Sequence, residues 1–419
     1  MDDCTVLLSL TTLWSVSLVT TMRSVTFTTR GALGKSSLRE ANERLVLTYI
    51  VRQPGISRLA IARATSLSPS AITGIVERLK VAGLVMDEKT EPTAQVGRPP
   101  SNLRLVPSSR HVVGVEITPF DATLVLADLV GNIVERREIA AEKTPETFLE
   151  RTNAALREIV AGAKTELLGV GVSIQGILDP ATGQVIAATN MNWRNVEAIR
   201  LLRQGLDLQF HWDNNANLSA LAEQWFALPG AQSLNDFVFV TLRGGLGTGL
   251  IFGGNLVQGA TARAGEFGHT VLYPDGRKCL CGNHGCWEEY ASDKALLRLY
   301  NERSGESLCD SLEVIRRAKA GDEAALAAVA QVGRDLGLGL MNVITGLNPA
   351  AICLDDFAAC GWDLIEPEIW NVLRSRVPDY WLAGVRIFPS EHAIHSSLSG
   401  AVALALSKYF TSFHNGQMA

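Results

Sequence analysis

The chain has 419 residues, of which 47% are hydrophobic and 19% are charged, and it contains 37 glycines. This composition is typical of a globular α/β protein and excludes a disordered or collagen-like chain, while the length allows two or three domains. The net charge of −5 is unevenly distributed, because residues 36–106 carry a local excess of Lys and Arg over Asp and Glu. A basic segment on an otherwise acidic chain is typical of a nucleic-acid-binding domain joined to a second function.

Residues 1–35 form an N-terminal extension that we expect to be disordered or to reflect a misassigned start, with Met22 as a second candidate start. Segment 4–21 is apolar, but Asp2 and Asp3 occupy the place of the basic region of a signal peptide, and Ser and Thr interrupt the run too often for a membrane span. Secretion is the alternative. Of the seven cysteines, Cys4, Cys309, Cys353 and Cys360 show no framework spacing, which favours a reduced, cytoplasmic protein.

A winged helix-turn-helix is predicted over residues 36–106. Apolar spacing indicates helices over 36–52 and 58–64, and Ser68, with Pro69 after it, is a typical start for a third helix. The buried stripe of that third helix follows the i, i+3, i+4, i+7 pattern, at Ile72, Ile75, Val76 and Leu79.

Two short strands, 84–86 and 103–106, flank a turn-rich wing. Arg98 lies in this wing between a glycine and a proline, so an extended arginine is available for a narrow minor groove. The exposed start of the third helix carries small side chains, which let a helix lie deep in the major groove. The predicted DNA contacts are Arg58, Ser68, Ser70, Ala71, Thr73 and Arg98. A three-helix bundle that binds protein is the alternative.

From His111 onward the pattern is strand, strand, strand, helix, strand, as in α/β proteins. The expected elements are strands at Val112–Ile117, Ala122–Ala127, Ile133–Ile139 and Leu167–Ile174, with a helix at Pro145–Ala163.

One histidine and three cysteines lie within eighteen residues, at His269, Cys279, Cys281 and Cys286. Three thiolates and one imidazole are a common closed ligand set for structural Zn²⁺, and glycines between the cysteines allow the tight folding that this requires. His284 is a competing ligand by spacing alone. Unrelated reduced cysteines or a redox pair are the alternatives.

These residues resemble the zinc motif of the ROK family (repressors, open reading frames and sugar kinases). The match runs from Gly265-Glu266-Phe267-Gly268-His269 through the cysteine cluster to Glu288. The N-terminal segment resembles ROK repressors too, through Ser57-Arg58-Leu59-Ala60, Leu67-Ser68 and Gly97-Arg98-Pro99. The resemblance therefore covers nearly the whole chain after Lys35.

The resemblance implies a two-lobed, actin-like sugar-kinase fold after the winged helix. We expect the first lobe to comprise 107–235 with 386–419, and the second lobe, which carries the zinc motif, to comprise 236–385. The C-terminal helix, 396–409, is expected to pack back on the first lobe.

The resemblance also implies a sugar site between the lobes. In the family the histidine binds zinc through one ring nitrogen and faces the sugar with the other, and the metal fixes its tautomer. The implied sugar-binding residues are Asn190, Asn214, Asn215, Glu266, His269 and Glu288.

The elements that a sugar kinase needs for phosphate transfer are degraded. Asn215 occupies the position of the catalytic Asp, and an amide cannot act as a general base. The family's first glycine-rich phosphate turn reads Glu116-Ile117-Thr118-Pro119-Phe120, and its last reads Asp355-Asp356, which would repel a triphosphate. We therefore expect no enzyme activity.

The sequence is interpreted as a cytoplasmic, sugar-responsive transcriptional regulator, a repressor of carbohydrate metabolism. The expected partners are double-stranded operator DNA, a sugar or sugar phosphate, and further copies of the chain in a dimer or tetramer, with no membrane. The alternative is an ATP-dependent sugar kinase with an attached DNA-binding domain. A third interpretation has the body bind a protein and no small ligand.

Overall fold

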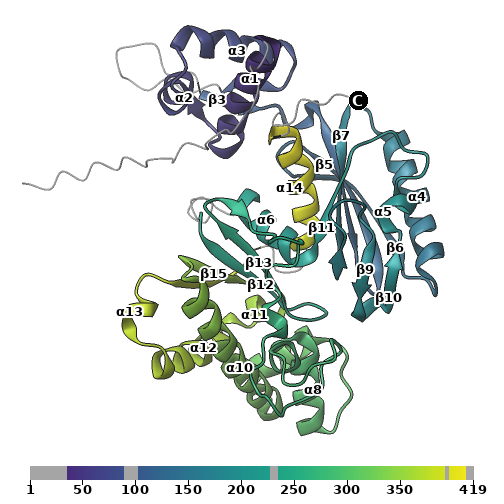
Figure 1. The fold of residues 1–419 in the computed structure, drawn as a ribbon, viewed down its shortest axis with the longest axis vertical. Coiled ribbons are helices and arrows are strands. Elements are labelled where there is room, and N and C mark those ends of the chain that lie inside the picture. Colours follow the sequence, from purple (N-terminus) through teal and green to yellow (C-terminus); the bar gives the residue numbers. More distant parts are fainter. Residues whose placement is uncertain (1–34, 89–101, 227–234, 392–395, 412–419) are drawn as a thin grey trace, which may run out of the picture.

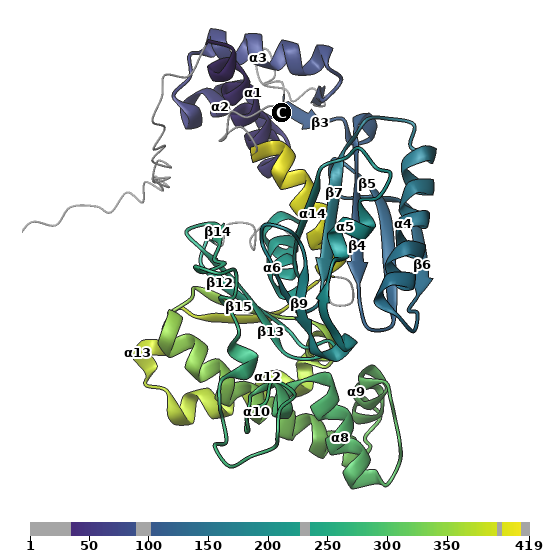
Figure 2. The ribbon, with the colours of Figure 1, turned by 45° about the vertical axis from the view of Figure 1, so that its right-hand side comes forward.

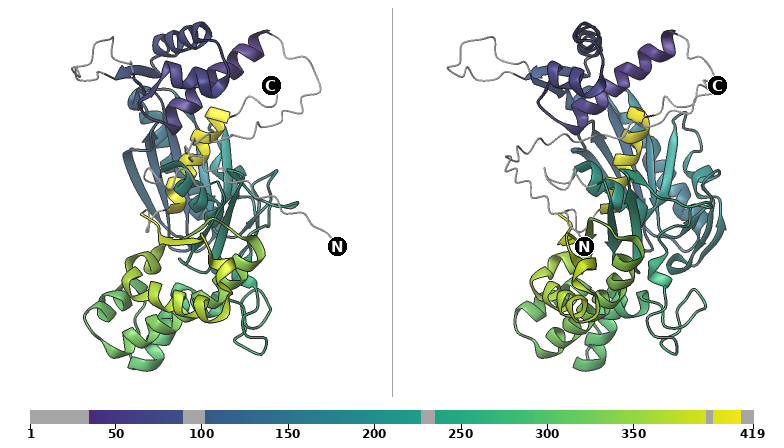
Figure 3. Two further views of the ribbon diagram at one scale, coloured as in Figure 1. Left: turned by 90° about the vertical axis from the view of Figure 1, so that its left-hand side faces the viewer. Right: turned by 60° about the vertical axis from the view of Figure 1, so that its left-hand side comes forward.

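The computed structural model describes residues 35–88, 102–226, 235–391 and 396–411. Figure 1 shows three parts along the long axis: a small helical domain at one end, a lobe built on one sheet, and a second lobe built on another sheet. The small domain lies beside the first lobe, and the second lobe lies at the opposite end of the molecule in each further view (Figure 3).

The N-terminal domain is a winged helix-turn-helix. It comprises α1 (Lys35–Arg52), α2 (Arg58–Thr65) and α3 (Pro69–Val81) on an antiparallel sheet in the order β1-β3-β2. Ser57 and Ser68 begin α2 and α3, and each accepts a backbone N–H with its side chain. The predicted stripe on α3 is buried. The strands are β1 (Ile56–Ser57), β2 (Val85–Glu88) and β3 (Asn102–Leu105).

The first lobe is built on a five-stranded sheet in the order β11-β7-β4-β5-β6. Helices α4 (Pro145–Gly162) and α5 (Ala198–Leu202) bury their apolar faces on one side of it, and α14 (Ser396–Thr411) packs on the other (Figure 2). The strands are β4 (His111–Ile117), β5 (Asp121–Asp128), β6 (Ile133–Ala140), β7 (Leu167–Ile174) and β11 (Phe210–Asn214). After β7 the chain forms a small antiparallel sheet of β8 (Ile177–Leu178), β9 (Val185–Ala188) and β10 (Trp193–Val196).

The second lobe is built on a sheet in the order β14-β13-β12-β15-β16. One face buries Val238 and Val240 against a group of helices, and the other buries Phe237 and Phe239 against α6 (Asn215–Phe226). The strands are β12 (Phe237–Thr241), β13 (Gly247–Phe252), β14 (Asn255–Leu256), β15 (Ala351–Leu354) and β16 (Arg386–Pro389). The helices are α7 (Glu288–Ala291), α8 (Asp293–Ser304), α9 (Ser311–Lys319), α10 (Glu323–Leu347), α11 (Asp356–Cys360), α12 (Trp362–Arg376) and α13 (Asp379–Leu382).

Strand β16 corrects one expected boundary. We expected residues 386–419 in the first lobe, but β16 pairs in parallel with β15 of the second sheet, from Arg386 beside Ala351 to Pro389 beside Leu354. The chain returns to the first lobe only with α14.

Helix α10 is long and apolar enough by composition to cross a membrane. Its apolar residues are instead part of the core of the second lobe, where α10 packs along α12.

Helix α14 connects all three parts of the molecule. It lies on β4 and β7, contacts α6 along its length and reaches α1 with its last turns (Figures 1 and 2). The helix lies so close to the sheet that a Cβ at Gly171 would collide with the carbonyl oxygen of Ala401, and a Cβ at Gly400 would collide with that of Leu218. At the far end, Arg44 of α1 donates to the carbonyl oxygen of Tyr409 at 2.9 Å.

Candidate sugar and metal site

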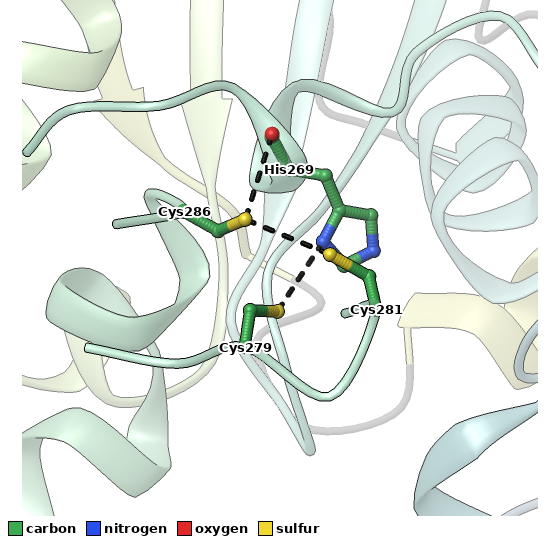
Figure 4. Close-up of side chains that lie close together, drawn as sticks. All are labelled: His269, Cys279, Cys281 and Cys286. Carbon is green, nitrogen blue, oxygen red and sulfur yellow. Dashed lines mark hydrogen bonds between the residues drawn. The ribbon is translucent and has the colours of Figure 1, made fainter. Parts of the chain in front are cut away.

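A histidine and three cysteines converge at the edge of the second lobe. His269 ends the short 3₁₀ turn Phe267–His269, and the cysteines follow in the loop that leads to α7. Figure 4 shows one ring nitrogen of His269 directed at the sulfur atoms and the other directed away from them. Cys279 and Cys286 are buried, whereas Cys281 is exposed.

The cluster fits a tetrahedral metal ion. The four candidate ligand atoms all lie within 4.8 Å of one another. The Sγ atoms of Cys281 and Cys286 are 3.7 Å apart, and Cys279 Sγ lies 3.7 Å from His269 Nδ1. Ligands about 2.0 to 2.3 Å from a zinc ion at tetrahedral angles are separated by about 3.5 to 3.8 Å. His284, the competing histidine, is not part of the cluster.

A cavity of about 180 Å³ opens beside this cluster, between the two lobes. All six residues that we predicted to bind a sugar line it: Asn190, Asn214, Asn215, Glu266, His269 and Glu288. The first lobe contributes the turn after β9 and Asn214 at the end of β11, α6 contributes its first residue, Asn215, and the second lobe contributes the loop that carries the histidine and the cysteines. The fold therefore brings these six residues together, although they are spread along the sequence from Asn190 to Glu288.

Two carboxylates flank the imidazole of His269. Glu266 Oε2 lies 3.9 Å from Nε2, and Glu288 Oε2 lies 3.7 Å from Nδ1. Burial raises the pKa of both carboxyls, and the nearby imidazole opposes that rise. Carboxylates that are partly desolvated and lie on either side of an oriented N–H donor are suited to accept hydrogen bonds from sugar hydroxyls.

Two amides, one at the end of β11 and one at the start of α6, line the cavity. Asn214 Oδ1 accepts the backbone N–H of Asn217 at 2.8 Å, which fixes the first turn of the helix. Asp213, the nearby carboxylate, is buried and points elsewhere, because it accepts hydrogen bonds from Asn217 Nδ2 at 2.8 Å and from Gln258 Nε2 at 2.6 Å. Asp213 is therefore not positioned to act as a general base on a ligand in the cavity.

Two side chains of the first lobe cross the cleft. Asn190 Nδ2 donates to the carbonyl oxygen of Gly244, and Gln175 Nε2 donates to that of Arg243 at 3.1 Å. Lys294 Nζ donates to Asn190 Oδ1. The sequence contains no signal for Lys294, because a lysine near the start of a helix cannot be distinguished by sequence from an ordinary solvent-exposed lysine.

A second cavity of about 40 Å³ lies at the base of the cleft, next to the segment 116–120. Glu116 accepts a hydrogen bond from Ser397 Oγ. Asp355, from the other lobe, accepts one from the backbone N–H of Leu242 at 3.0 Å and one from Ser396 Oγ at 2.9 Å. The region that we expected to correspond to the phosphate site of the kinases is therefore narrow and lined by two buried acidic side chains.

Asp355 and Asp356 differ from ordinary carboxyls. Burial raises the pKa of Asp355 to about 7, and burial together with the charge of Asp355 raises that of Asp356 to about 8. Asp356 also has a positive φ of 54°. Burial of two neighbouring acidic groups therefore favours the protonated, neutral form of each carboxyl.

Four of the six predicted DNA contacts lie at one exposed end of α3. They are Ser68, Ser70, Ala71 and Thr73. Arg58, the fifth predicted DNA contact, pairs with Asp87 Oδ1 at 2.9 Å and with Glu77 Oε1 at 3.5 Å. It joins α2 to β2 and α3 within the domain. Arg98 lies outside the described residues.

Comparison with known proteins supports the same division of the chain. A model of the ROK family matches residues 112–408, and a model of a winged helix-turn-helix DNA-binding domain matches residues 39–86. The chain is 26% identical to the xylose repressor of Caldicellulosiruptor bescii over 387 residues, covering 88% of this chain and 96% of that protein. It is also 26% identical to the DNA-binding transcriptional dual regulator NagC of Escherichia coli over 379 residues, covering 88% and 92%.

Two solved structures give the fold. The crystal structure of a ROK family transcriptional regulator, a homologue of the Escherichia coli MLC protein, matches with a TM-score of 0.75 at 23% identity, covering 90% of this chain and 98% of that one. A ROK family glucokinase from Streptomyces griseus, in complex with glucose and AMPPNP, matches with a TM-score of 0.64 at 26% identity, covering 71% and 99%.

The raised pKa of Asp356 generates a prediction about pH and stability. Its unfolded pKa is about 3.9, so between that pH and about 8 the folded chain holds a proton that the unfolded chain has lost. Stability from this group is therefore lost as the pH rises through that window. We expect Asp356→Asn, which tolerates the positive φ, to raise the Tm at pH 8.5 relative to the parent protein by about 2 °C or more, and by less at pH 5.

The measurement is thermal unfolding at both pH values, with the exposed Asp207→Asn as a matched control. An Asp356→Asn gain that is equal at the two pH values would contradict the raised pKa.

Proposed function

The chain belongs to the ROK family, and we propose that it is a sugar-responsive transcriptional repressor of carbohydrate metabolism that acts in the cytoplasm. The observation that carries this proposal is the combination, in one chain, of a winged helix-turn-helix and an interlobe cavity lined by all six predicted sugar-binding residues. Relatives named xylose repressor and N-acetylglucosamine repressor support the same assignment.

The cavity is suited to a polyhydroxylated ligand. Glu266 and Glu288 supply acceptors, and the asparagines at 214 and 215 supply both donors and acceptors. In our proposal, His269 donates from the ring nitrogen that faces away from the cysteines. A sugar bound here would contact α6 and the metal-binding loop together, and thus elements on both sides of the cleft.

We propose that Zn²⁺ occupies the cluster of His269, Cys279, Cys281 and Cys286 as a structural ion. The donor set and its spacing support this assignment. The metal would fix the loop before α7 and the tautomer of His269, and so orient the donor that faces the sugar.

The proposal excludes phosphate transfer as the function. Asn215 lacks the basicity to accept a hydroxyl proton, and Asp213 is held by Asn217 and Gln258. Glu116 and Asp355 line the region that corresponds to the phosphate site, and Pro119 there supplies no backbone N–H. The alternative, a sugar kinase with an attached DNA-binding domain, is favoured only by the fold that the chain shares with kinases such as the Streptomyces griseus glucokinase.

Helix α14 offers a route from the sugar site to the DNA-binding domain. Its first two residues, Ser396 and Ser397, donate to Asp355 of the second lobe and Glu116 of the first lobe. Its last turns share an apolar cluster with α1, and Arg44 lies over the ring of Tyr409. A change in lobe closure would therefore pull on one end of a helix whose other end holds the winged helix.

The DNA-binding surface is proposed at the exposed N-terminal end of α3, with the wing residue Arg98 in the minor groove. Repressors with this motif bind two half-sites as symmetric dimers, so the active form is proposed to be a homodimer or a tetramer.

Calorimetric titration with sugars tests the proposal against the kinase alternative. We expect heat from a sugar alone and none from Mg-ATP. Binding of ATP, or heat that continues as turnover, would place the protein among the kinases.

We predict that purified protein contains about one zinc ion per chain and that Cys281→Ser removes it. Since Cys281 is exposed, its loss costs little packing, and the expected effects are loss of zinc and a weaker affinity for sugar. Elemental analysis and calorimetry measure both. The control is Cys309→Ser, which changes another exposed cysteine outside the cluster. Full zinc content in the Cys281 variant would contradict the assignment of Cys281 as a zinc ligand.

We predict that Asn215→Asp does not create a sugar kinase. The substitution restores a carboxylate at the catalytic position, but Pro119 supplies no N–H, and the carboxylates of Glu116 and Asp355 remain. A coupled assay for ADP, with an active ROK glucokinase as the positive control, should detect no transfer from ATP to any sugar that binds. Sugar-dependent turnover in the variant would show that the phosphate region is intact.

We predict that Arg44→Ala uncouples the two sites. Sugar affinity should be unchanged, whereas the ratio of operator affinities with and without sugar, expected to be about 5-fold or more in the parent, should fall toward one. Calorimetry and fluorescence anisotropy on operator DNA measure the two quantities. Arg200→Ala, which removes an exposed side chain of α5, is the control. An unchanged ratio in the Arg44 variant would rule out this route.

A further inference from the structure

The sugar cavity is lined by cations that a neutral sugar does not need. Arg243, Lys294 and Arg298 all line it, together with the two carboxylates that flank His269. The proposed roles of the asparagines, the carboxylates and the imidazole account for hydroxyl recognition, and they leave these three positive charges unexplained.

Two of the three cations already have partners in the protein. Arg298 donates to the carbonyl oxygen of Glu289 at 2.5 Å and lies 3.9 Å from the carboxylates of Glu289 and Glu302. Arg243 lies close enough to Asp355 and Asp356 to lower the pKa of both carboxyls. Both arginines therefore serve to balance charges within the second lobe.

Lys294 differs from the arginines. Its Nζ donates to the neutral amide oxygen of Asn190, and within residues 35–88, 102–226, 235–391 and 396–411 no carboxylate lies within ion-pair distance of it. Glu288 and Asp293 feel its charge only at longer range, where it lowers their pKa against the effect of burial. The ammonium group is thus directed at the cavity with no anionic partner in contact.

The backbone N–H groups near Lys294 are not available to bind an anion. Lys294 is the second residue of α8, and Ser292, which caps that helix, also lines the cavity. The first N–H groups of the helix are already used, because Asp293 Oδ1 accepts from Lys294 N at 2.7 Å and Ser292 Oγ accepts from Ala295 N at 3.3 Å. The positive end of the helix adds to the local potential, but the donor that remains for a ligand is the ammonium of Lys294.

We infer that Lys294 is a specificity-determining residue and that the effector is an anionic sugar, carrying a phosphate or a carboxylate. This inference rests on the proposed function. The anionic group replaces Asn190 Oδ1 as the acceptor of the Lys294 ammonium, and a lysine suits this role as a compact point charge. Asn190 keeps its bond to the carbonyl oxygen of Gly244, and its released oxygen becomes available to a sugar hydroxyl.

The experiment compares matched sugars by calorimetry. The probes are glucose, glucose 6-phosphate and glucuronate; N-acetylglucosamine and its 6-phosphate; and xylose and xylose 5-phosphate. We expect an anionic member of one set to bind about tenfold or more tightly than its neutral counterpart. The phosphate and carboxylate arms show which anion is recognised.

Lys294→Met should lose about tenfold or more in affinity for the anionic sugar, and Lys294→Arg should keep part of it. Affinity for the neutral counterpart should change much less in both variants. Raising the salt from about 0.05 to about 0.5 M should weaken binding of the anionic sugar alone. Lys143→Met, which removes an exposed lysine far from Lys294 in the sequence, is the control for the change in net charge. Thermal unfolding confirms that each variant is folded.

The inference is overturned, with the proposed function intact, if a neutral sugar binds at least as tightly as its anionic forms, or if Lys294→Met leaves the affinity for the anionic sugar unchanged. Binding of an anionic sugar that depends on Lys294 but has no effect on operator affinity would overturn the proposed function alone. A panel in which no compound binds would overturn both.

Discussion

Helix α14 is the constraint on which the arrangement of the three parts depends. It is wedged between the first sheet and α6 at contacts that only glycine allows, at Gly171 and Gly400. Its N-terminal serines are bonded to one carboxylate from each lobe, and its last turns are bonded to α1. Because buried, close-packed elements move as units rather than deform continuously, we propose that a shift between the lobes is transmitted to the winged helix through this helix.

The sugar site follows from the same architecture. The cleft is bounded by the N-terminus of α6, which packs on α14, and by the loop that the cysteine cluster organises on the second lobe. At its base, Asp355 both lines the former phosphate region and holds Ser396. The acidic side chain of Asp355, which lies in the region where a kinase of this family would hold phosphate, is thereby also part of the connection to α14.

Local patterns predicted much of the fold, and long-range contacts limited the rest. All the signals for α3, namely Ser68, Pro69 and the buried apolar stripe, lie in or next to its thirteen residues, so the sequence alone predicted this helix. The boundary at residue 386 was wrong, because a four-residue strand does not reveal which sheet it joins. The partners of Arg58 lie across the domain, on β2 and α3, and Lys294 becomes part of the site only when the cleft brings it to Asn190. The spacing of residues within a motif can be recognised from the sequence alone. The role of a charged side chain depends on which residues lie near it in the folded structure.

The most direct test of the account is the affinity of the full-length protein for its operator, recovered by selection from genomic fragments, with and without the sugar that binds in calorimetry. A sugar-dependent change of about 5-fold or more is the predicted result. A sugar that saturates the cavity and leaves the operator affinity unchanged would contradict the claim that this chain is a sugar-responsive repressor.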